Sequence, residues 1–230
     1  MLLIAHRGYH AAIPENTFDA FQAAIAIGAN GIETDVRISR DGLPVLIHDR
    51  ITRTGEPVAE LTRAEIEKIS GHEIPTLEEA LESFPGLLWN IEIKTPAVLS
   101  KTIDVIERHQ AGHRILVTSF HHELVAACAS ALKVNCGFLM SHRPRTLDSL
   151  LADFNADGNP RINHIIWNYE VLDSVLLEQA AESGFRNWVY GPVNGAEHDD
   201  CRALGADGVI TDHPLLAQIA WQMTSKVPST

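Results

Sequence analysis

The stretches IETDVRI (residues 32–38) and LWNIEIK (residues 88–94) decide the fold. Each is a short, mostly apolar run, which is typical of a buried strand in a parallel sheet. Each also carries two ionisable residues spaced two apart: Glu33 and Asp35 on the first, Glu92 and Lys94 on the second. Residues two apart on a strand point to the same face. We therefore expect two strands that present charged groups on one common face.

The rest of the chain repeats this alternation of apolar runs and helical patterns. We expect strands at Leu2–Arg7, Ile32–Ile38, Leu88–Lys94, Ile115–Ser119, Val134–Leu139, His164–Asn168, Trp188–Tyr190 and Gly208–Thr211. We expect helices at Asn16–Ile27, Pro75–Ser83, Val98–Arg108, His121–Leu132, Thr146–Phe154, Val171–Ser183, Glu197–Leu204 and Pro214–Met223. Eight such units in 230 residues favour an α/β fold of the (β/α)8 TIM-barrel type, with an open doubly wound sheet as the alternative.

The chain reads as one domain over residues 1–230. Its longest connection, about residues 50–74, holds Thr62 and Glu65 at the spacing of a capping box. We therefore expect a short insertion after the second strand that contains one small helix. The last residues, Lys226–Thr230, read as a loose tail.

Composition narrows the class of protein and its partners. The formal net charge of −12 argues against nucleic acids and anionic membrane surfaces as partners. The apolar start is too short for a secretory signal, and no apolar run reaches the length of a membrane span. Three cysteines without a Cys-x-x-Cys spacing favour a reducing compartment. We expect a soluble, cytoplasmic protein, as a monomer or a homodimer, without stable membrane insertion.

The charged strand ends predict a metal site. In a barrel of this type the carboxyl ends of the strands surround the opening where the active site lies. Glu33, Asp35 and Glu92 would meet there, and carboxylates that approach one another repel unless they are protonated or share a cation. An all-oxygen ligand set selects Mg²⁺ or Ca²⁺. The alternative is that these side chains point outward or form a structural salt bridge.

Two histidines and two cations belong to the same rim. His6 closes the first strand, and His48 follows a short extended run that leaves the second unit. Imidazoles titrate near neutral pH, so the pair suits general acid and base roles in the cleavage of a phosphodiester. Arg7 and Lys94 would bind the charge of the phosphate.

Several motifs, in order along the chain, resemble those of the glycerophosphodiester phosphodiesterase family. They are His6-Arg7-Gly8, Pro14-Glu15-Asn16-Thr17 with Phe21, Gly28 to Val36, Asp41-Gly42 with Pro44-Val45 through His48-Asp49, Pro75 to Glu79, Asn90 to Lys94, Ser119-Phe120, and Gly205 to Asp212 with Pro214. The likeness extends from Ile4 to about Pro214.

The resemblance implies a metal-dependent hydrolase that converts glycerophosphodiesters, its small-molecule substrates, into sn-glycerol 3-phosphate and an alcohol. Carried over by position, the metal ligands are Glu33, Asp35 and Glu92, the acid/base pair is His6 and His48, and the phosphate-binding residues are Arg7 and Lys94. Attack by the substrate's 2-hydroxyl through a cyclic phosphate and direct attack by water both remain open, as does which histidine is the acid. Asn16 or Thr17 would cap the first helix, and Asn16 would also reach the site by a hydrogen bond.

The chain departs from the family pattern at its seventh expected strand. Tyr190-Gly191-Pro192-Val193-Asn194 stands where the family usually has a Trp followed by Thr-Val-Asn. We expect Tyr190 either to line the alcohol side of the pocket or to pack in the core. The short insertion should leave the site open to varied leaving groups. Two alternative functions are a phospholipase D-like or C-like barrel acting on lysophospholipids, and a non-catalytic metal- or phosphate-binding protein.

Overall fold

The computed structural model describes residues 1–152 and 159–224. In these ranges eight parallel strands form a barrel: β1 (Leu2–His6), β2 (Gly31–Ile38), β4 (Leu88–Ile93), β5 (Arg114–Ser119), β6 (Asn135–Met140), β7 (Ile162–Asn168), β8 (Arg186–Tyr190) and β9 (Gly208–Thr211). Strand β1 pairs with both β2 and β9, which closes the sheet. The predicted TIM barrel is therefore confirmed, and the open sheet is wrong.

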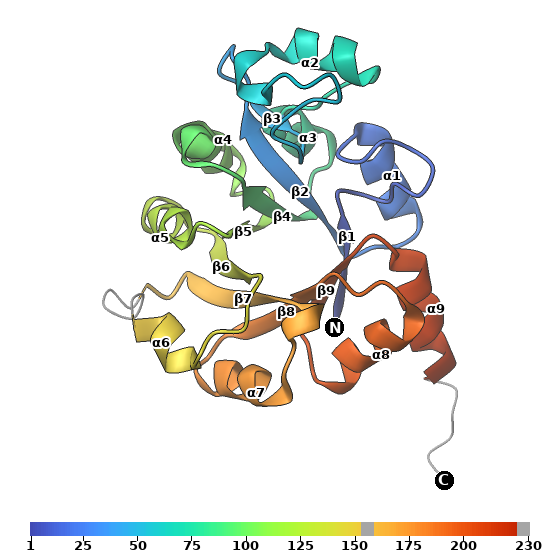
Figure 1. The fold of residues 1–230 in the computed structure, drawn as a ribbon, viewed down its shortest axis with the longest axis vertical. Coiled ribbons are helices and arrows are strands. Elements are labelled where there is room, and N and C mark those ends of the chain that lie inside the picture. The colour runs from blue at the N-terminus through green and yellow to red at the C-terminus, as the bar shows by residue number, and fades with distance from the viewer. Residues whose placement is uncertain (153–158, 225–230) are drawn as a thin grey trace.

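Helices surround the barrel in the sequence order of the strands (Figure 1). They are α1 (Phe18–Ala26), α3 (Leu77–Ser83), α4 (Leu99–His109), α5 (His122–Ala131), α6 (Leu147–Ala152), α7 (Ser174–Glu182), α8 (Gly195–Ala203) and α9 (Pro214–Thr224). Short 3-10 helices cover Val58–Glu60, Pro96–Val98 and Tyr169–Val171. The end of the helix expected at Thr146–Phe154 and the tail at Lys226–Thr230 lie outside the described residues. In the described ranges no helix has the length and apolarity needed to cross a membrane.

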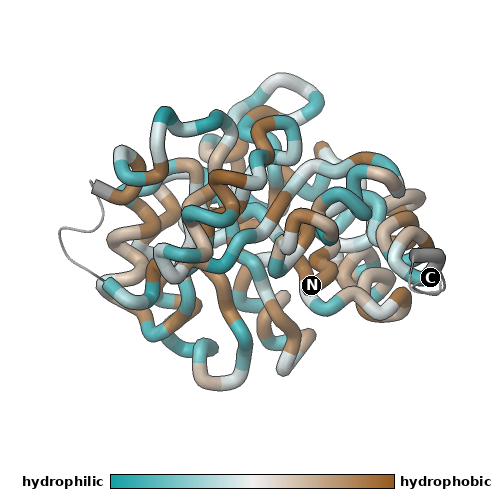
Figure 2. Tube along the Cα trace, turned by 90° about the horizontal axis from the view of Figure 1, so that it is seen from below, coloured by the Kyte–Doolittle hydropathy of each residue, from teal (hydrophilic) through white to brown (hydrophobic). Residues whose placement is uncertain are grey.

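Two apolar layers hold the barrel together, one inside it and one between the strands and the helices. The inner layer consists of Ile4, Leu88, Leu116, Leu139, Ile166, Trp188 and Ile210. The outer layer includes Phe21 of α1 and Trp89 of β4, whose rings meet edge to face with centroids 5.2 Å apart. Hydrophobic and hydrophilic residues alternate along residues 1–152 and 159–224 (Figure 2), as expected for elements with one buried face. Each fully buried large apolar side chain contributes about 1.5–3 kcal/mol to the free energy of unfolding.

One glycine is required for the inner layer to close. A Cβ atom on Gly208 of β9 would lie 2.8 Å from the ring of Trp188 on the neighbouring strand. Because such a contact is too short for any side chain, the large indole of Trp188 can fill the barrel interior only beside a glycine.

The insertion after β2 forms a small lobe at the edge of the molecule (Figure 1). Strand β3 (Pro44–Leu46) runs antiparallel to β2, and helix α2 (Arg63–Ser70) begins at Thr62 with the predicted capping box. Val45, Val58, Ile66 and Ile74 give this lobe an apolar cluster of its own. The chain therefore leaves β3 in a fixed direction, and His48 follows two residues after its end.

Candidate active site

One cavity of about 210 Å³ at the carboxyl end of the strands gathers nearly all of the predicted site residues. Its lining includes His6, Arg7, Glu33, His48, Glu92, Lys94 and Tyr190. Strand alternation explains this, because His6 lies two residues beyond the inner-layer Ile4, and Glu92 lies four beyond Leu88. The same face of each strand is apolar in the barrel interior and charged at its end.

Three buried carboxylates converge at this end. Glu33, Asp35 and Glu92 each offer an oxygen, and these atoms lie within 4.8 Å of one another. Burial, and then the charges of Asp35 and Glu92, raise the pKa of Glu33 well above its usual value. Burial is also the main reason that the pKa of Glu92 is raised. Acidic groups in this position are relieved by a shared cation, so the donor set fits a hard divalent metal.

Asp35 differs from its two neighbours. Burial would raise its pKa, but the positive charges of Lys94 and Arg7 and a hydrogen bond from Asn16 outweigh that effect, and the pKa is lowered. Its Oδ1 atom is buried and accepts no hydrogen bond from the described residues, while Lys94 Nζ lies 3.2 Å away. A buried carboxylate oxygen in this state is a suitable metal ligand.

Arg7 and Lys94 pair with the acidic groups. Arg7 Nε lies 3.1 Å from Asp35 Oδ2, and its NH1 donates to both oxygens of Glu15 at 2.9 Å. Lys94 Nζ lies 2.7 Å from Glu92 Oε1. The predicted phosphate-binding cations thus sit among the carboxylates themselves. This makes the site a compact mixture of both charge signs.

Two residues of the β1–α1 connection hold unusual backbone angles. Arg7 and Asn16 have φ values of 54° and 55°, in the left-handed region that non-glycine residues seldom adopt. Strain of this kind concentrates at functional sites. Asn16 Nδ2 donates to Asp35 Oδ2 at 3.0 Å, as expected from the sequence, whereas Thr17 provides the cap of α1.

His6 has a partner that sequence reasoning missed. Its Nδ1 atom lies 2.6 Å from Asp212 Oδ1, and its Nε2 atom lies 3.7 Å from Glu33 Oε2. His10 Nε2 approaches the same oxygen of Asp212 at 3.0 Å. Although burial opposes it, hydrogen bonding to both imidazoles strongly lowers the pKa of Asp212. The signal was present, since Asp212 follows inner-layer Ile210 by two residues and so belongs to the same face.

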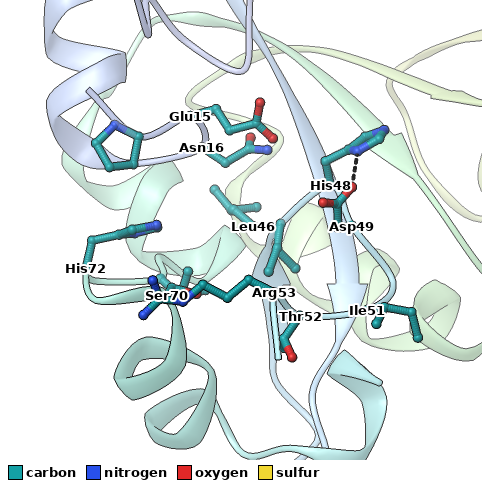
Figure 3. Close-up of a pocket in the computed structure, with 13 residues that line it drawn as sticks. Glu15, Asn16, Leu46, His48, Asp49, Ile51, Thr52, Arg53, Ser70 and His72 are labelled. Carbon is teal, nitrogen blue, oxygen red and sulfur yellow. Dashed lines mark hydrogen bonds and ion pairs between the residues drawn. The ribbon is translucent and has the colours of Figure 1, made fainter. Parts of the chain in front are cut away.

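His48 lies on the insertion side of the site. Its Nδ1 atom is 2.9 Å from Asp49 Oδ1, a contact drawn in Figure 3. The close-up shows His48 and Asp49 across a second cavity from Glu15 and Asn16. This cavity of about 270 Å³ extends from the site toward the insertion. Each predicted catalytic histidine therefore has a carboxylate at Nδ1.

Asn90 is a further polar group that the sequence analysis did not single out. It lies on β4 two residues before Glu92 and is fully buried. It lines the 210 Å³ cavity that holds the carboxylates. Its Nδ2 donates to Thr118 Oγ1 at 2.7 Å, while its Oδ1 has no partner among the described residues. The Asn90 carbonyl oxygen is therefore a buried acceptor without a described partner, next to the cavity.

Tyr190 lines the cavity and also packs against the inner layer. The apolar side chains of Phe120, Leu139 and Ile210 line the same cavity. The Tyr190 ring packs edge to face on Phe120 at 6.1 Å between centroids, and its hydroxyl donates to Met140 O at 3.4 Å. The cavity consequently has one charged wall and one apolar wall.

Comparison with known proteins identifies the family. The sequence profile of the Glycerophosphoryl diester phosphodiesterase family matches residues 6–216. The glycerophosphodiester phosphodiesterase of Caldanaerobacter subterraneus subsp. tengcongensis is 39% identical over 241 aligned residues, which cover 93% of this chain and 94% of that protein.

Solved structures agree on the fold. The glycerophosphodiester phosphodiesterase of Thermotoga maritima has a TM-score of 0.82 at 25% identity and covers 95% of this chain and 97% of its own. A phosphodiesterase of Oleispira antarctica, solved in complex with the product sn-glycerol-3-phosphate, has a TM-score of 0.84 at 22% identity, covering 96% and 97%. Because the profile match begins at His6 and runs past the last barrel strand, the chain belongs to the glycerophosphoryl diester phosphodiesterase family.

Proposed function

We propose that this enzyme hydrolyses glycerophosphodiesters to sn-glycerol 3-phosphate and an alcohol, and that a divalent cation takes part. The observation that carries the proposal is the convergence of three buried carboxylates, two cationic side chains and two imidazoles at one cavity. A phosphodiester needs its negative charge neutralised, its nucleophile activated and its leaving group protonated. The cavity offers side chains for each task.

Glu33, Asp35 and Glu92 would hold the cation, with Mg²⁺ and Ca²⁺ as the candidates. Such an ion supplies Lewis acidity toward phosphate oxygens. It would also relieve the repulsion that raises the pKa of Glu33 and Glu92. Arg7 and Lys94 border the same carboxylates, so they are placed to share the remaining phosphate charge.

His6 and His48 are proposed as the acid and base. A carboxylate at Nδ1 holds an imidazole with its proton on that atom and leaves Nε2 to exchange a proton with the substrate. Asp212 plays this part for His6, and Asp49 for His48. One histidine would remove a proton from the attacking hydroxyl or water while the other protonates the departing alkoxide.

The apolar wall formed by Phe120, Leu139, Tyr190 and Ile210 would contact the organic part of the substrate. These contacts would orient the diester so that the alcohol departs toward a histidine.

Product identity tests the proposal. Glycerophosphocholine should yield sn-glycerol 3-phosphate and choline, whereas cleavage on the other side of phosphorus would yield glycerol and phosphocholine. Lysophosphatidylcholine is assayed in parallel, because its cleavage would indicate a lysophospholipase rather than a glycerophosphodiesterase. Glu92→Gln keeps the side-chain volume and removes one charge, so it should abolish turnover; Glu107→Gln, on the exposed surface of α4, should not change it. Exclusive cleavage of the lysophospholipid, or release of phosphocholine, would contradict the proposed function.

A further inference from the structure

A third cavity, separate from the two near the active site, opens at the other end of the barrel, where the strands begin. It has a volume of about 470 Å³. Leu2, Leu88 and Trp188 form an apolar floor that belongs to the inner layer or packs against it. Arg114, Lys133 and Arg186 line its rim and are exposed. Because the inner layer lies between the two ends, this cavity is separate from the carboxylate cluster.

The two arginines are part of the barrel architecture. Arg114 is the first residue of β5 and lies two positions before inner-layer Leu116. Arg186 begins β8, two positions before Trp188 and four before Tyr190. Side chains at this spacing share one face of a strand, so both arginines belong to the inward-facing rows. The guanidinium groups are therefore held around the opening by strands rather than by loops.

These cations have no ionic partner among the described residues. No carboxylate in residues 1–152 and 159–224 lies within ion-pair distance of Arg114, Lys133 or Arg186, and the described lining contains no acidic side chain. Other arginines, such as Arg63 and Arg108, do pair with glutamates. In a chain with a net charge of −12, unpaired cations around one cavity are unexpected. They leave charge available to an external anion.

A nearly buried histidine lies beside these cations. His164 lines the cavity and is 5% exposed; its ring packs edge to face on Trp188, with centroids 5.5 Å apart. Its Nδ1 bonds to Asn163 Oδ1 at 2.6 Å, and its Nε2 has no described partner. Burial and then the charge of Arg186 lower the pKa of His164 to about 4, although Asp207 acts in the opposite direction. Burial thus keeps His164 neutral near pH 7.

We propose that this end of the barrel binds a small phosphate-bearing anion at a site distinct from the catalytic cavity. Arg114 on β5 and Arg186 on β8 line the same cavity with two strands between them. Each guanidinium group can donate two parallel hydrogen bonds to the oxygens of a phosphate. Lys133 adds a third cation at the rim. The apolar floor of Leu2, Leu88 and Trp188 suits the carbon skeleton of an organic phosphate.

Calorimetric titration with inorganic phosphate tests the site. The protein is first treated with a chelator, because without a cation the three carboxylates repel anions from the catalytic cavity. Ionic strength is held constant with sodium chloride at pH 7. Wild type should show saturable binding. Arg114→Gln/Arg186→Gln should weaken it by about tenfold or more, since both charge-assisted contacts are lost. Arg186→Lys, which keeps the charge but not the planar fork, should give an intermediate affinity.

Matched controls separate a built site from general charge effects. Lys101→Gln/Arg145→Gln removes the same charge from exposed residues outside the cavity and should leave binding unchanged. Glycerol 3-phosphate, titrated in parallel, shows whether the carbon skeleton adds affinity. No saturable binding in wild type, or equal binding in both double variants, would overturn the proposal. If the arginine double variant fails to fold, Lys133→Gln removes an exposed cation of the same cavity and should also weaken phosphate binding.

The catalytic proposal does not depend on this result. Arg114→Gln/Arg186→Gln should keep the wild-type kcat/KM for glycerophosphodiester cleavage, measured without added phosphate. Loss of phosphate binding with unchanged turnover would support a separate anion site. A parallel loss of turnover would contradict the separation of the two ends of the barrel.

Discussion

Asp212 Oδ1 lies 2.6 Å from His6 Nδ1 and 3.0 Å from His10 Nε2, so one carboxylate oxygen serves two imidazoles. If Asp212 fixes the ring and proton position of His6, then Asp212→Asn should lower kcat about 10- to 100-fold with a smaller change in KM. His10→Gln, which removes only the second imidazole, should keep most of the activity. Steady-state kinetics on glycerophosphocholine provides the measurement. Equal losses in kcat for the two variants would argue against a specific role for Asp212.

The two histidines can be assigned by their response to the leaving group. His6→Ala and His48→Ala should each lose about 10²- to 10⁴-fold in kcat on glycerophosphocholine. A substrate that releases p-nitrophenolate needs little protonation, so it should partly rescue the variant that lacks the acid. Rates of both variants on both substrates give the answer. The same loss on both substrates in both variants would contradict separate acid and base roles.

Tyr190 is expected to sort leaving groups. Its ring lines the apolar wall of the cavity against Phe120, and a quaternary ammonium on an aromatic face gains about 0.5–2 kcal/mol. Tyr190→Ala should therefore reduce kcat/KM more for glycerophosphocholine than for glycerophosphoethanolamine or glycerophosphoglycerol. Tyr190→Phe should behave like wild type. A uniform drop, together with a lower melting temperature, would show that Tyr190 only packs the barrel.

The strands, the carboxylates at their ends and the helix cap of the insertion could be predicted from the sequence, because they follow from local patterns. Apolar runs such as Leu88–Ile93 are found as strands, and the two-residue spacing of Glu33 and Asp35 places both carboxylates at one strand end. The capping box at Thr62 likewise depends on neighbours three residues apart. Short-range periodicity thus predicted the strands of the barrel and the charged residues at their carboxyl ends.

Other features depend on contacts between distant parts of the chain. The spacing of Asp212 from Ile210 indicates its face, but its contact with His6, 206 positions away in sequence, depends on barrel closure. The pairing of Arg7 and Lys94 with Asp35 depends on how β1, β2 and β4 align in the closed sheet. These relationships come from barrel closure, so they required the structure.

Stability should fall in mildly acidic solution because of His164. Its folded pKa of about 4 lies below the unfolded value of about 6.5, so the unfolded chain binds a proton first as the pH decreases. Above pH 6.5 His164 has little effect on the free energy of unfolding. Near pH 4 its proton uptake in the unfolded state lowers that free energy by about 2–3 kcal/mol. Denaturant titrations of wild type and His164→Phe at several pH values measure it. Identical pH dependence in both proteins would show that His164 does not titrate this way.

A cation shared by Glu33, Asp35 and Glu92 is expected to be necessary for turnover, and removing and restoring the metal tests this most directly. The measurement is the rate of sn-glycerol 3-phosphate release from glycerophosphocholine by chelator-treated enzyme, as a function of added Mg²⁺ or Ca²⁺. We predict no turnover without metal and a saturable return of the wild-type rate, shifted to higher metal concentration or lost in Asp35→Asn. Full activity in excess chelator would contradict the account.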